Sequence, residues 1–388
     1  MSPDPARAEI VVDVATIRAN VRRLRALVAG PDTPGVQMMT VVKADGYGHG
    51  MVPAARSARD AGAEWLGVAT IDEALALREA GDTGPVLCWL GVPGEDYAAA
   101  IAHGIDITAY SLAELAEIGA AAREVGRVAR LQLKVDTGLS RGGCTMADWP
   151  TLVGAARKAE VDDLVDVTGV WSHFACSDEP EHPANDAQET VFREALGVAA
   201  EAGLEPEVRH LANSAAAILR PSSRFDLVRC GIASYGLDPA PGQPGTAAVG
   251  LVPAMTVRAG LSMVKRIAAG DSVSYGHTWT ADHDTTVALV PAGYGEGVPR
   301  VAGNRAEVAV GGKRRPIRGV VCMDQFVVDL GDDTAEPGDD VVLFGTGADG
   351  TPTATDWAEA VGTINYEIVT RIGGRFARRV VDSEEAPA

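Results

Sequence analysis

The 388-residue chain has few cysteines, few aromatic residues and no recognisable metal-ligand pattern. Its 5 cysteines are scattered and form no Cys-x-x-Cys pair, and its 7 histidines show no paired-ligand spacing. Disulfide frameworks and zinc sites depend on such spacings. We therefore expect reduced, buried thiols and no bound metal.

Clustered basic residues and long apolar runs are missing as well. Lys and Arg number 34 against 53 Asp and Glu, which gives a formal net charge of -19. Nucleic acids and anionic membranes are recognised by clustered positive charge, so neither is expected as a partner. No run approaches the roughly 18 consecutive apolar residues of a membrane-spanning helix. The first residues, MSPDPARAEIVVD, are acidic where a signal peptide would be basic and then apolar, so we predict a cytoplasmic protein.

What the sequence does contain is a regular alternation of apolar runs and amphipathic stretches. Apolar residues at helical spacing predict a first helix over residues 14–28. Eight runs typical of buried parallel strands follow, at 38–42, 65–68, 86–90, 105–108, 129–135, 165–171, 207–211 and 225–228. Helical patterns lie between them, for example at 51–61, 71–80, 112–125, 149–158 and 188–202. Eight strand–helix units in about 230 residues predict a (β/α)8 TIM barrel, which typically takes about 250 residues.

The alternation stops after a segment rich in Pro and Gly at 238–247. From Met255 onward the pattern is strand-like with turns, at 261–267, 286–291, 306–310, 316–321, 326–330 and 340–343. Only residues 355–360 have a helical pattern there. We therefore predict an α/β chain with a barrel domain at 1–247 and a mostly β C-terminal domain at 248–388. A first strand at about residues 8–13 can pair with the C-terminal domain.

A lysine closes the first predicted barrel strand, in the segment Val-Val-Lys43-Ala-Asp-Gly-Tyr47-Gly-His-Gly. The carboxyl ends of barrel strands form the face on which barrel enzymes keep their active sites, and glycines let a ligand approach the backbone. Burial lowers the pKa of an amine and makes it nucleophilic, as a Schiff-base lysine must be. The alternative is a lysine that extends from a strand end into solvent.

This lysine segment closely resembles the cofactor-lysine motif of alanine racemases, the barrel-fold class of pyridoxal-phosphate enzymes. Further segments match in order along nearly the whole chain: KVDTGLSRGG from Lys134, SHFA from Ser172, HLANSA from His210, RCGIASYG from Arg229, SYGHT from Ser274, CMDQ from Cys322 and NYE from Asn365. The resemblance implies interconversion of L- and D-alanine, which supplies D-alanine for peptidoglycan. It also implies pyridoxal 5'-phosphate as cofactor and a homodimer with shared active sites.

The residues expected to hold the cofactor lie at strand ends. Ser214 follows the seventh strand at a helix start, and Gly231 and Ile232 follow the eighth, so their backbone N–H groups can hold a phosphate. The alternative for Ser214 and the residue before it is a simple helix cap. The resemblance adds hydroxyl contacts from Tyr47 and Tyr366.

By the resemblance, Arg229 faces the pyridine nitrogen of the cofactor. A guanidinium is permanently charged and donates without accepting a proton, so that nitrogen stays unprotonated. The weaker electron withdrawal limits side reactions and favours racemisation. The alternative is an ordinary surface or salt-bridged arginine.

Inversion of a stereocentre requires acid/base groups on both faces of the α-carbon. The resemblance assigns the proton of D-alanine to Lys43 and that of L-alanine to Tyr275, which comes from the partner subunit. A tyrosine with a pKa of about 10 is a poor base at neutral pH. We expect His173, linked to Arg229, to stabilise its phenolate. Alone, Tyr275 would be a strand-end core residue and His173 a buried histidine.

Arg141 is implied to bind the substrate carboxylate together with the backbone N–H of Met323, because guanidinium donors pair with both carboxylate oxygens. Lys134 lies where some family members carry a carbamylated lysine; the alternative is an unmodified lysine paired with an acid. Tyr294 and Asp324 would line the substrate entry. No metal is implied.

One segment departs from the family pattern. Members usually read Gly-Tyr-Ala-Asp-Gly, whereas this chain reads GYGEGV from Gly293. The tyrosine is retained. The shape and charge of the entryway, and with them the breadth of substrates, are left open.

Two other functions compete with alanine racemase. The first is another barrel-type pyridoxal-phosphate enzyme, either a broad-specificity racemase or a basic amino-acid decarboxylase. A decarboxylase would be expected to have a carboxylate in place of Arg229 and has no need for Tyr275. The second is a cofactor-carrying binding protein without turnover, but such proteins resemble the barrel alone.

Overall fold

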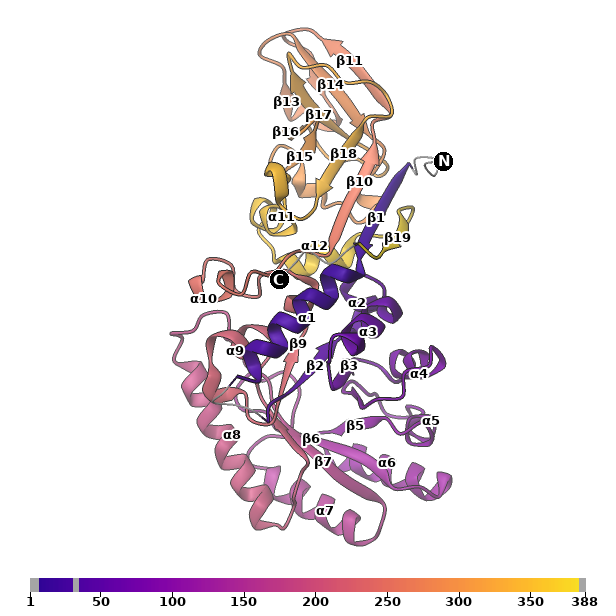
Figure 1. Cartoon of the computed structure of the whole chain (residues 1–388), viewed down its shortest axis with the longest axis vertical. Coiled ribbons are helices and arrows are strands. Elements are labelled where there is room, and N and C mark those ends of the chain that lie inside the picture. Colours follow the sequence, from indigo (N-terminus) through magenta and orange to yellow (C-terminus); the bar gives the residue numbers. More distant parts are fainter. Residues whose placement is uncertain (1–6, 31–34, 384–388) are drawn as a thin grey trace.

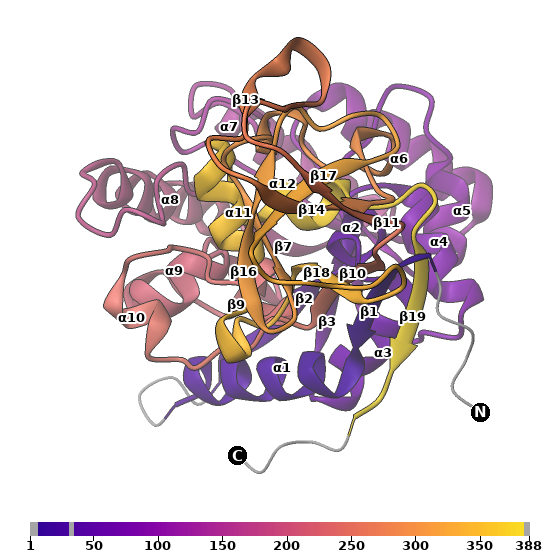
Figure 2. The same ribbon diagram turned by 90° about the horizontal axis from the view of Figure 1, so that it is seen from above.

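The computed structural model describes residues 7–30 and 35–383. A barrel forms the lower part of the molecule in Figure 1, and a sheet-rich part stands above it. Seen from above, helices surround the barrel and the sheet-rich part covers one of its ends (Figure 2).

Eight parallel strands form the barrel: β2 (Gln37–Val41), β3 (Trp65–Val68), β4 (Val86–Cys88), β5 (Asp106–Ala109), β6 (Ala129–Lys134), β7 (Val165–Trp171), β8 (Val208–His210) and β9 (Leu227–Cys230). Their order is β8-β7-β6-β5-β4-β3-β2-β9. At the seam, the N–H of Asp226 donates to the carbonyl of Arg209 at 3.1 Å, and the N–H of Arg229 donates to Ala212 at 3.0 Å. The barrel is therefore nearly closed, and the predicted fold class is confirmed.

Helices cover the outside of the barrel: α3 (Met51–Asp60), α4 (Ile71–Glu79), α5 (Tyr97–Ala102), α6 (Leu112–Val125), α7 (Trp149–Val161), α8 (Ala184–Glu201) and α9 (Ser214–Leu219). The short α2 (Lys43–Tyr47) follows the first barrel strand, and α10 (Pro244–Ala247) lies in the connection to the second part. Strands such as β3 and β5 are buried along their whole length, as parallel strands covered on both faces must be.

The second part is built on a nine-stranded sheet with the order β11-β14-β17-β16-β15-β18-β10-β1-β19. Its strands are β1 (Ala8–Asp13), β10 (Met255–Gly260), β11 (Met263–Ile267), β14 (Thr285–Val290), β15 (Glu307–Val310), β16 (Lys313–Arg318), β17 (Phe326–Gly331), β18 (Asp340–Phe344) and β19 (Ala377–Val381). The short β12 (Ser272–Val273) and β13 (Trp279–Thr280) form a separate hairpin-like pair. β1 pairs antiparallel with β10 and parallel with β19.

The expectation of a single helical pattern near the C-terminus is wrong. Two helices occur there, α11 (Ala354–Val361) and α12 (Asn365–Arg371). The second contains β-branched Ile368, Val369 and Thr370, which have low helix propensity, so tertiary packing decides its conformation. It packs on α2, next to Lys43.

Helix α1 (Val14–Val28) ties the two parts together. Asp13 caps it by accepting from the N–H of Ala15 at 3.0 Å. On its buried face, Asn20 donates to the carbonyl of Val252 at 2.8 Å and accepts from the N–H of the same residue at 3.0 Å. Across residues 7–30 and 35–383, every helix is too short or too polar to cross a lipid bilayer.

Candidate active site

A cavity of about 570 Å³ opens at the carboxyl ends of the barrel strands, beneath α12. Its lining brings together ten residues that the sequence predicted for the site: Lys43, Tyr47, Lys134, Arg141, His173, Ser214, Arg229, Gly231, Ile232 and Tyr366. Four of them are basic, so the cavity suits an anionic ligand.

Lys43 is followed by a left-handed turn. Residues 44–47 have φ angles of 52°, 53°, 63° and 53°. For residues other than glycine this conformation costs roughly 1–2 kcal/mol each, so the surrounding structure must hold the turn in place.

Three side chains provide that support. Glu73 accepts from the N–H of Ala44 at 2.7 Å, and Asp45 forms an ion pair with Arg378 at 2.6 Å. His49 is fully buried, and its Nδ1–H is directed at the carbonyls of residues 46 and 47, each at 3.0 Å. The turn therefore fixes both Lys43 and Tyr47 at the cavity.

The amine of Lys43 lies over the ring of Trp89, with Nζ 5.5 Å from the ring centroid. Burial is the main cause that lowers the pKa of Lys43, and the charges of Arg141 and Arg229 lower it further, while Glu73 opposes them. A lowered pKa favours the neutral amine, which is the nucleophilic form.

Arg229 extends from β9 and is 5% exposed. Its Nη1 donates to Nδ1 of His210 at 2.8 Å, and its Nη2 donates to the carbonyl of Ser172 at 2.8 Å. The same Nη2 lies 3.1 Å from Nδ1 of His173. Because a guanidinium only donates, both imidazoles must present an unprotonated Nδ1 and carry their proton on Nε2.

Burial also sets the charge of these groups. It lowers the pKa of Arg229 to about 9 and holds the pKa of His173 well below its ordinary value, with Arg229 adding to the effect on the histidine. His173 is therefore a neutral imidazole, held by Arg229 at the cavity wall.

Lys134 ends β6, and its Nζ lies 4.5 Å from the ring centroid of Trp171. Burial, followed by the charges of Arg229 and Arg141, lowers the pKa of Lys134 to about 8. Within the described residues neither Lys134 nor Arg141 forms an ion pair with a carboxylate.

Backbone and hydroxyl groups line another wall. Ser214 begins α9, and its Oγ accepts from the N–H of Gly231 at 2.9 Å. A Cβ at Gly231 would lie 2.4 Å from the hydroxyl oxygen of Tyr47, so a side chain there would displace this tyrosine. Burial raises the pKa of Tyr47 and of Tyr366, so both keep their O–H groups. Asn213 caps α9 by accepting from the N–H of Ala216 at 3.1 Å, so the cap and the cavity lining coexist.

Among the predicted site residues of the β-rich part, Tyr366 lines this cavity, whereas Tyr275, Tyr294, Met323 and Asp324 do not. Tyr275 is 73% exposed, Met323 54% and Tyr294 42%. The N–H of Tyr294 donates to the carbonyl of Cys322 at 3.0 Å, so the loops that carry Met323 and Tyr294 lie side by side. Asp324 accepts from Arg375 at 2.5 Å.

Arg375 also contacts the segment that departs from the family pattern. Glu296 is 2% exposed on its side chain and pairs with Arg375, and it accepts from the N–H of Gly293 at 2.8 Å. A Cβ on Gly295 would lie 3.0 Å from the carbonyl of Met323. Both departures therefore lie at the same ion pair: Glu296, where the family usually has Asp, pairs with Arg375, and Gly295, where the family usually has Ala, packs against Met323.

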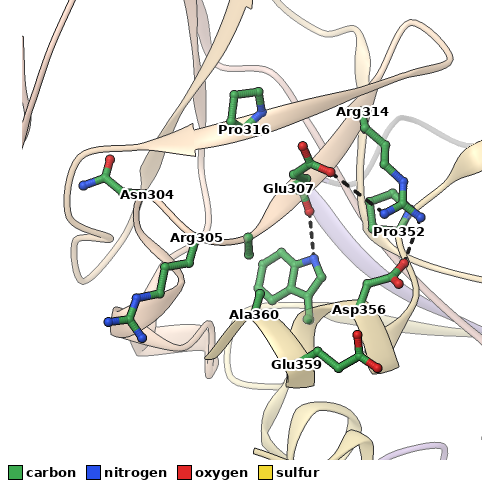
Figure 3. A pocket seen from close by; sticks show the side chains of 11 residues that line it. Asn304, Arg305, Glu307, Arg314, Pro316, Pro352, Asp356, Glu359 and Ala360 are labelled. Carbon is green, nitrogen blue, oxygen red and sulfur yellow. Dashed lines mark hydrogen bonds and ion pairs between the residues drawn. The ribbon is translucent and has the colours of Figure 1, made fainter. Parts of the chain in front are cut away.

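A second hollow, of about 320 Å³, lies in the β-rich part (Figure 3). Arg314 stands between two acids there and pairs with Asp356 at 2.8 Å, while the indole N–H of Trp357 donates to the carbonyl of Glu307. Arg305 points away from these acids. The lining of this second hollow includes no Lys, His, Ser, Tyr or Cys, so we assign the chemistry to the barrel cavity.

Some cavity residues were missed by sequence reasoning. They are chiefly aromatic or histidine side chains: Trp89, Tyr110, Trp171 and, behind Arg229, His210. Trp171 and His210 stand next to or within the matched segments, and that position was the available signal.

Comparison with known proteins agrees with this geometry over nearly the whole chain. Family profiles for the N-terminal and C-terminal domains of alanine racemase match residues 12–239 and 254–380. An alanine racemase of Salinispora arenicola is 55% identical over 378 residues, covering 97% of this chain and 99% of that one. The crystal structure of alanine racemase from D-cycloserine producing Streptomyces lavendulae has 52% identity and a TM-score of 0.95, covering 98% and 99% of the two chains. An alanine racemase from Bacillus anthracis with bound L-Ala-P has 33% identity and a TM-score of 0.84, covering 98% and 96%.

Proposed function

The chain belongs to the alanine racemase family and interconverts L- and D-alanine, and from this premise we propose which residues perform the reaction. Lys43 carries pyridoxal 5'-phosphate and moves a proton on one face of the substrate. Tyr275 of the partner subunit moves a proton on the other face. The observation that carries this proposal is that the buried cavity gathers Lys43 and Arg229, whereas Tyr275 is 73% exposed.

The family is known to depend on pyridoxal phosphate, and the cavity residues of this chain fit that group. The backbone at Gly231 and Ile232 and the hydroxyl of Ser214 suit a phosphate, because Ser214 Oγ accepts from the N–H of Gly231 and its O–H can still donate to a ligand. Tyr47 and Tyr366 add protonated hydroxyls. When bound, the cofactor withdraws electrons from the α-carbon of an attached amino acid and so acidifies its α-hydrogen.

Arg229 limits that withdrawal. Its guanidinium would donate to the ring nitrogen of a bound cofactor without giving up a proton. Contacts with two histidines and two carbonyls fix its direction. A carboxylate at this position would keep the ring nitrogen protonated. Arg229 therefore favours return of the proton over decarboxylation or transamination.

The two acid/base groups act from opposite faces, as inversion requires. The lowered pKa of Lys43 makes its amine a base for the α-hydrogen of D-alanine. Tyr275 of the partner subunit serves L-alanine. Because Nδ1 of His173 accepts from Arg229, its Nε2–H remains to donate to the phenol oxygen and stabilise the phenolate.

Arg141 and the backbone N–H of Met323 bind the substrate carboxylate in this proposal, and Tyr294 and Asp324 line the entry. Lys134 is the candidate for carbamylation, because a carbamate forms from a neutral amine and carbon dioxide with loss of a proton, and burial favours that neutral amine. The resulting anion would face Arg141. A mass increase on a Lys134-containing peptide measures it.

The biological setting is part of the same proposal. A homodimer with shared sites works in the cytoplasm and supplies D-alanine for peptidoglycan. The domain boundary after residue 247 also stays a prediction.

Exchange of the α-hydrogen in deuterium oxide tests the assignment. We expect the wild-type protein to incorporate deuterium from both alanine enantiomers. Tyr275→Phe should lower exchange from L-alanine by about 10²–10⁴-fold, since one acid/base group is lost, while the visible absorbance of the cofactor on Lys43 stays. Near wild-type exchange in this variant would refute the two-base assignment. Release of carbon dioxide would indicate a decarboxylase, and absence of any exchange would indicate a binding protein.

A further inference from the structure

We infer that Asp106 and Gln132 are positioning residues that orient Arg229 from within the barrel through His210. The inference rests on the proposed function, because it concerns the arginine assigned to the cofactor ring. Neither residue lines the cavity.

A line of buried polar groups leads from Arg229 into the barrel interior. Nδ1 of His210 lies 2.8 Å from Nη1 of Arg229, and Nε2 of His210 lies 2.7 Å from Oε1 of Gln132. Nε2 of Gln132 then donates to Oδ2 of Asp106 at 3.1 Å. The three residues behind Arg229 are fully buried and come from β8, β6 and β5.

The chemistry of the two ends gives this line a single direction. Arg229 can only donate, and the carboxylate of Asp106 can only accept. Asp106 therefore turns the amide of Gln132 so that its oxygen faces His210, and that oxygen accepts the Nε2–H. The remaining lone pair of His210, on Nδ1, faces Arg229. Every bond in the line is thus a donor paired with an acceptor.

The neighbouring strands hold the line in one arrangement. Thr168 donates to Oδ2 of Asp106 at 2.6 Å, and Arg130 pairs with Oδ1 at 2.7 Å. A Cβ on Gly169 would lie 2.7 Å from Cδ of Gln132, so this glycine makes room for the amide. The ring of Trp171 stacks on His210 with an interplanar angle of 6°.

Arg229 needs such support because its acceptors are neutral: two imidazole nitrogens and two backbone carbonyls. Arg141 lines the same cavity and adds positive charge. Hydrogen bonds in a row polarise one another at low dielectric, so the anionic end strengthens His210 as an acceptor. Asp106 thereby acts as a remote counter-charge for Arg229.

Substitutions at Gln132 test the line without touching the cavity. In Gln132→Met the side chain has a similar length, but its hydrogen bonds with Asp106 and His210 are lost. Gln132→Glu keeps the line, because a glutamic acid that shares a proton with Asp106 donates to that carboxylate and still accepts from His210. Arg130→Gln is the matched control, since it removes the outer ion pair of Asp106 and leaves the line intact.

The measurement uses holoenzyme loaded with pyridoxal phosphate carrying ¹⁵N in the ring, whose chemical shift reports the hydrogen bond from Arg229. We expect Gln132→Met to move the shift towards that of the free base and to lower kcat about tenfold with little change in KM, the effect of losing about one hydrogen bond. Gln132→Glu and Arg130→Gln should keep the wild-type shift, even where Arg130→Gln lowers stability.

An unchanged shift and kcat in Gln132→Met would overturn the inference. So would equal changes in Gln132→Met and Arg130→Gln, because both would then reflect stability alone. If Arg229→Lys also left the shift unchanged, the contact of Arg229 with the ring would itself be wrong, and the proposed role of this arginine would fail with the inference.

Discussion

The environment of the Lys43 amine lowers its pKa although a carboxylate lies nearby. Burial is the largest cause of its lowered pKa, Arg141 adds to it, and Glu73 acts in the opposite direction. Glu73 also accepts from the N–H of Ala44, so the same carboxylate supports the turn and raises the pKa of the amine. Glu73 therefore affects both the position of Lys43 and the pKa of its amine.

The lowered pKa predicts the pH dependence of cofactor attachment. Attack on the aldehyde of pyridoxal phosphate requires the neutral amine, which is present at lower pH when the pKa is lowered. For the apoprotein mixed with cofactor, we expect the rate of absorbance change to rise with pH through a midpoint below the ordinary lysine value of 10.5.

Glu73→Gln removes the charge that raises the pKa of Lys43, so its midpoint should lie lower than that of the wild type. Glu79→Gln, an exposed change on the same helix, serves as the control and should leave the midpoint in place. A midpoint that rises in Glu73→Gln would contradict this account of the amine.

At the scale of elements, the left-handed turn after β2 depends on the helix packed over it. Gly48 follows the turn with φ +81°, and its α-carbon faces the carbonyl of Val369 in α12. The same helix carries Tyr366 over the cavity. The contact at Gly48 therefore links the Lys43 turn to a residue expected to hold the cofactor.

Two glycine substitutions separate backbone strain from this contact. Gly62→Ala places a side chain at φ +94° in open space, and we expect it to cost about 1 kcal/mol in the free energy of unfolding. Gly48→Ala adds a Cβ 2.4 Å from the carbonyl oxygen of Val369, which should cost about 1–3 kcal/mol more. Urea unfolding of both variants provides the comparison. Equal decreases in the free energy of unfolding would show that α12 can shift away from residue 48 at no cost.

The elements that the sequence predicted well are those with strong periodicity. Each of the eight barrel strands lies within two residues of its predicted start, because fully apolar runs separated by amphipathic helices leave few alternatives. The turn at 44–47 could not be predicted, since only Gly46 among its residues commonly adopts a positive φ. Helix α12 was missed because its β-branched residues favour strands, and its helical form depends on packing against α2.

For the whole molecule, the barrel topology made much of the site predictable. The carboxyl ends of parallel strands meet on one face, so Lys43, His173 and Arg229 could be expected to lie together from their strand positions alone. The contacts behind Arg229 could not, because they depend on how side chains of β5, β6 and β8 pack inside the barrel. The exposure of Tyr275 could not be predicted from the barrel either, because it depends on how the β-rich part folds.

The proposed homodimer with shared active sites predicts a specific pattern of activity in mixed dimers. A heterodimer of one Lys43→Ala subunit and one Tyr275→Phe subunit, purified with two affinity tags, should keep one intact site and about half of the wild-type activity. In the reciprocal control, a wild-type subunit paired with a subunit carrying both substitutions should be nearly inactive, because each site then lacks one group. Activity in the control and none in the first heterodimer would place both groups within a single chain.

The pairing of β1 between β10 and β19 has a consequence for the order of folding during synthesis. Residues 8–13 are synthesised well before their partners, residues 255–260 and 377–381. Loop-closing contacts of such length form slowly and late. The barrel can assemble while translation continues, whereas the nine-stranded sheet is completed only after residues 377–381 have been synthesised.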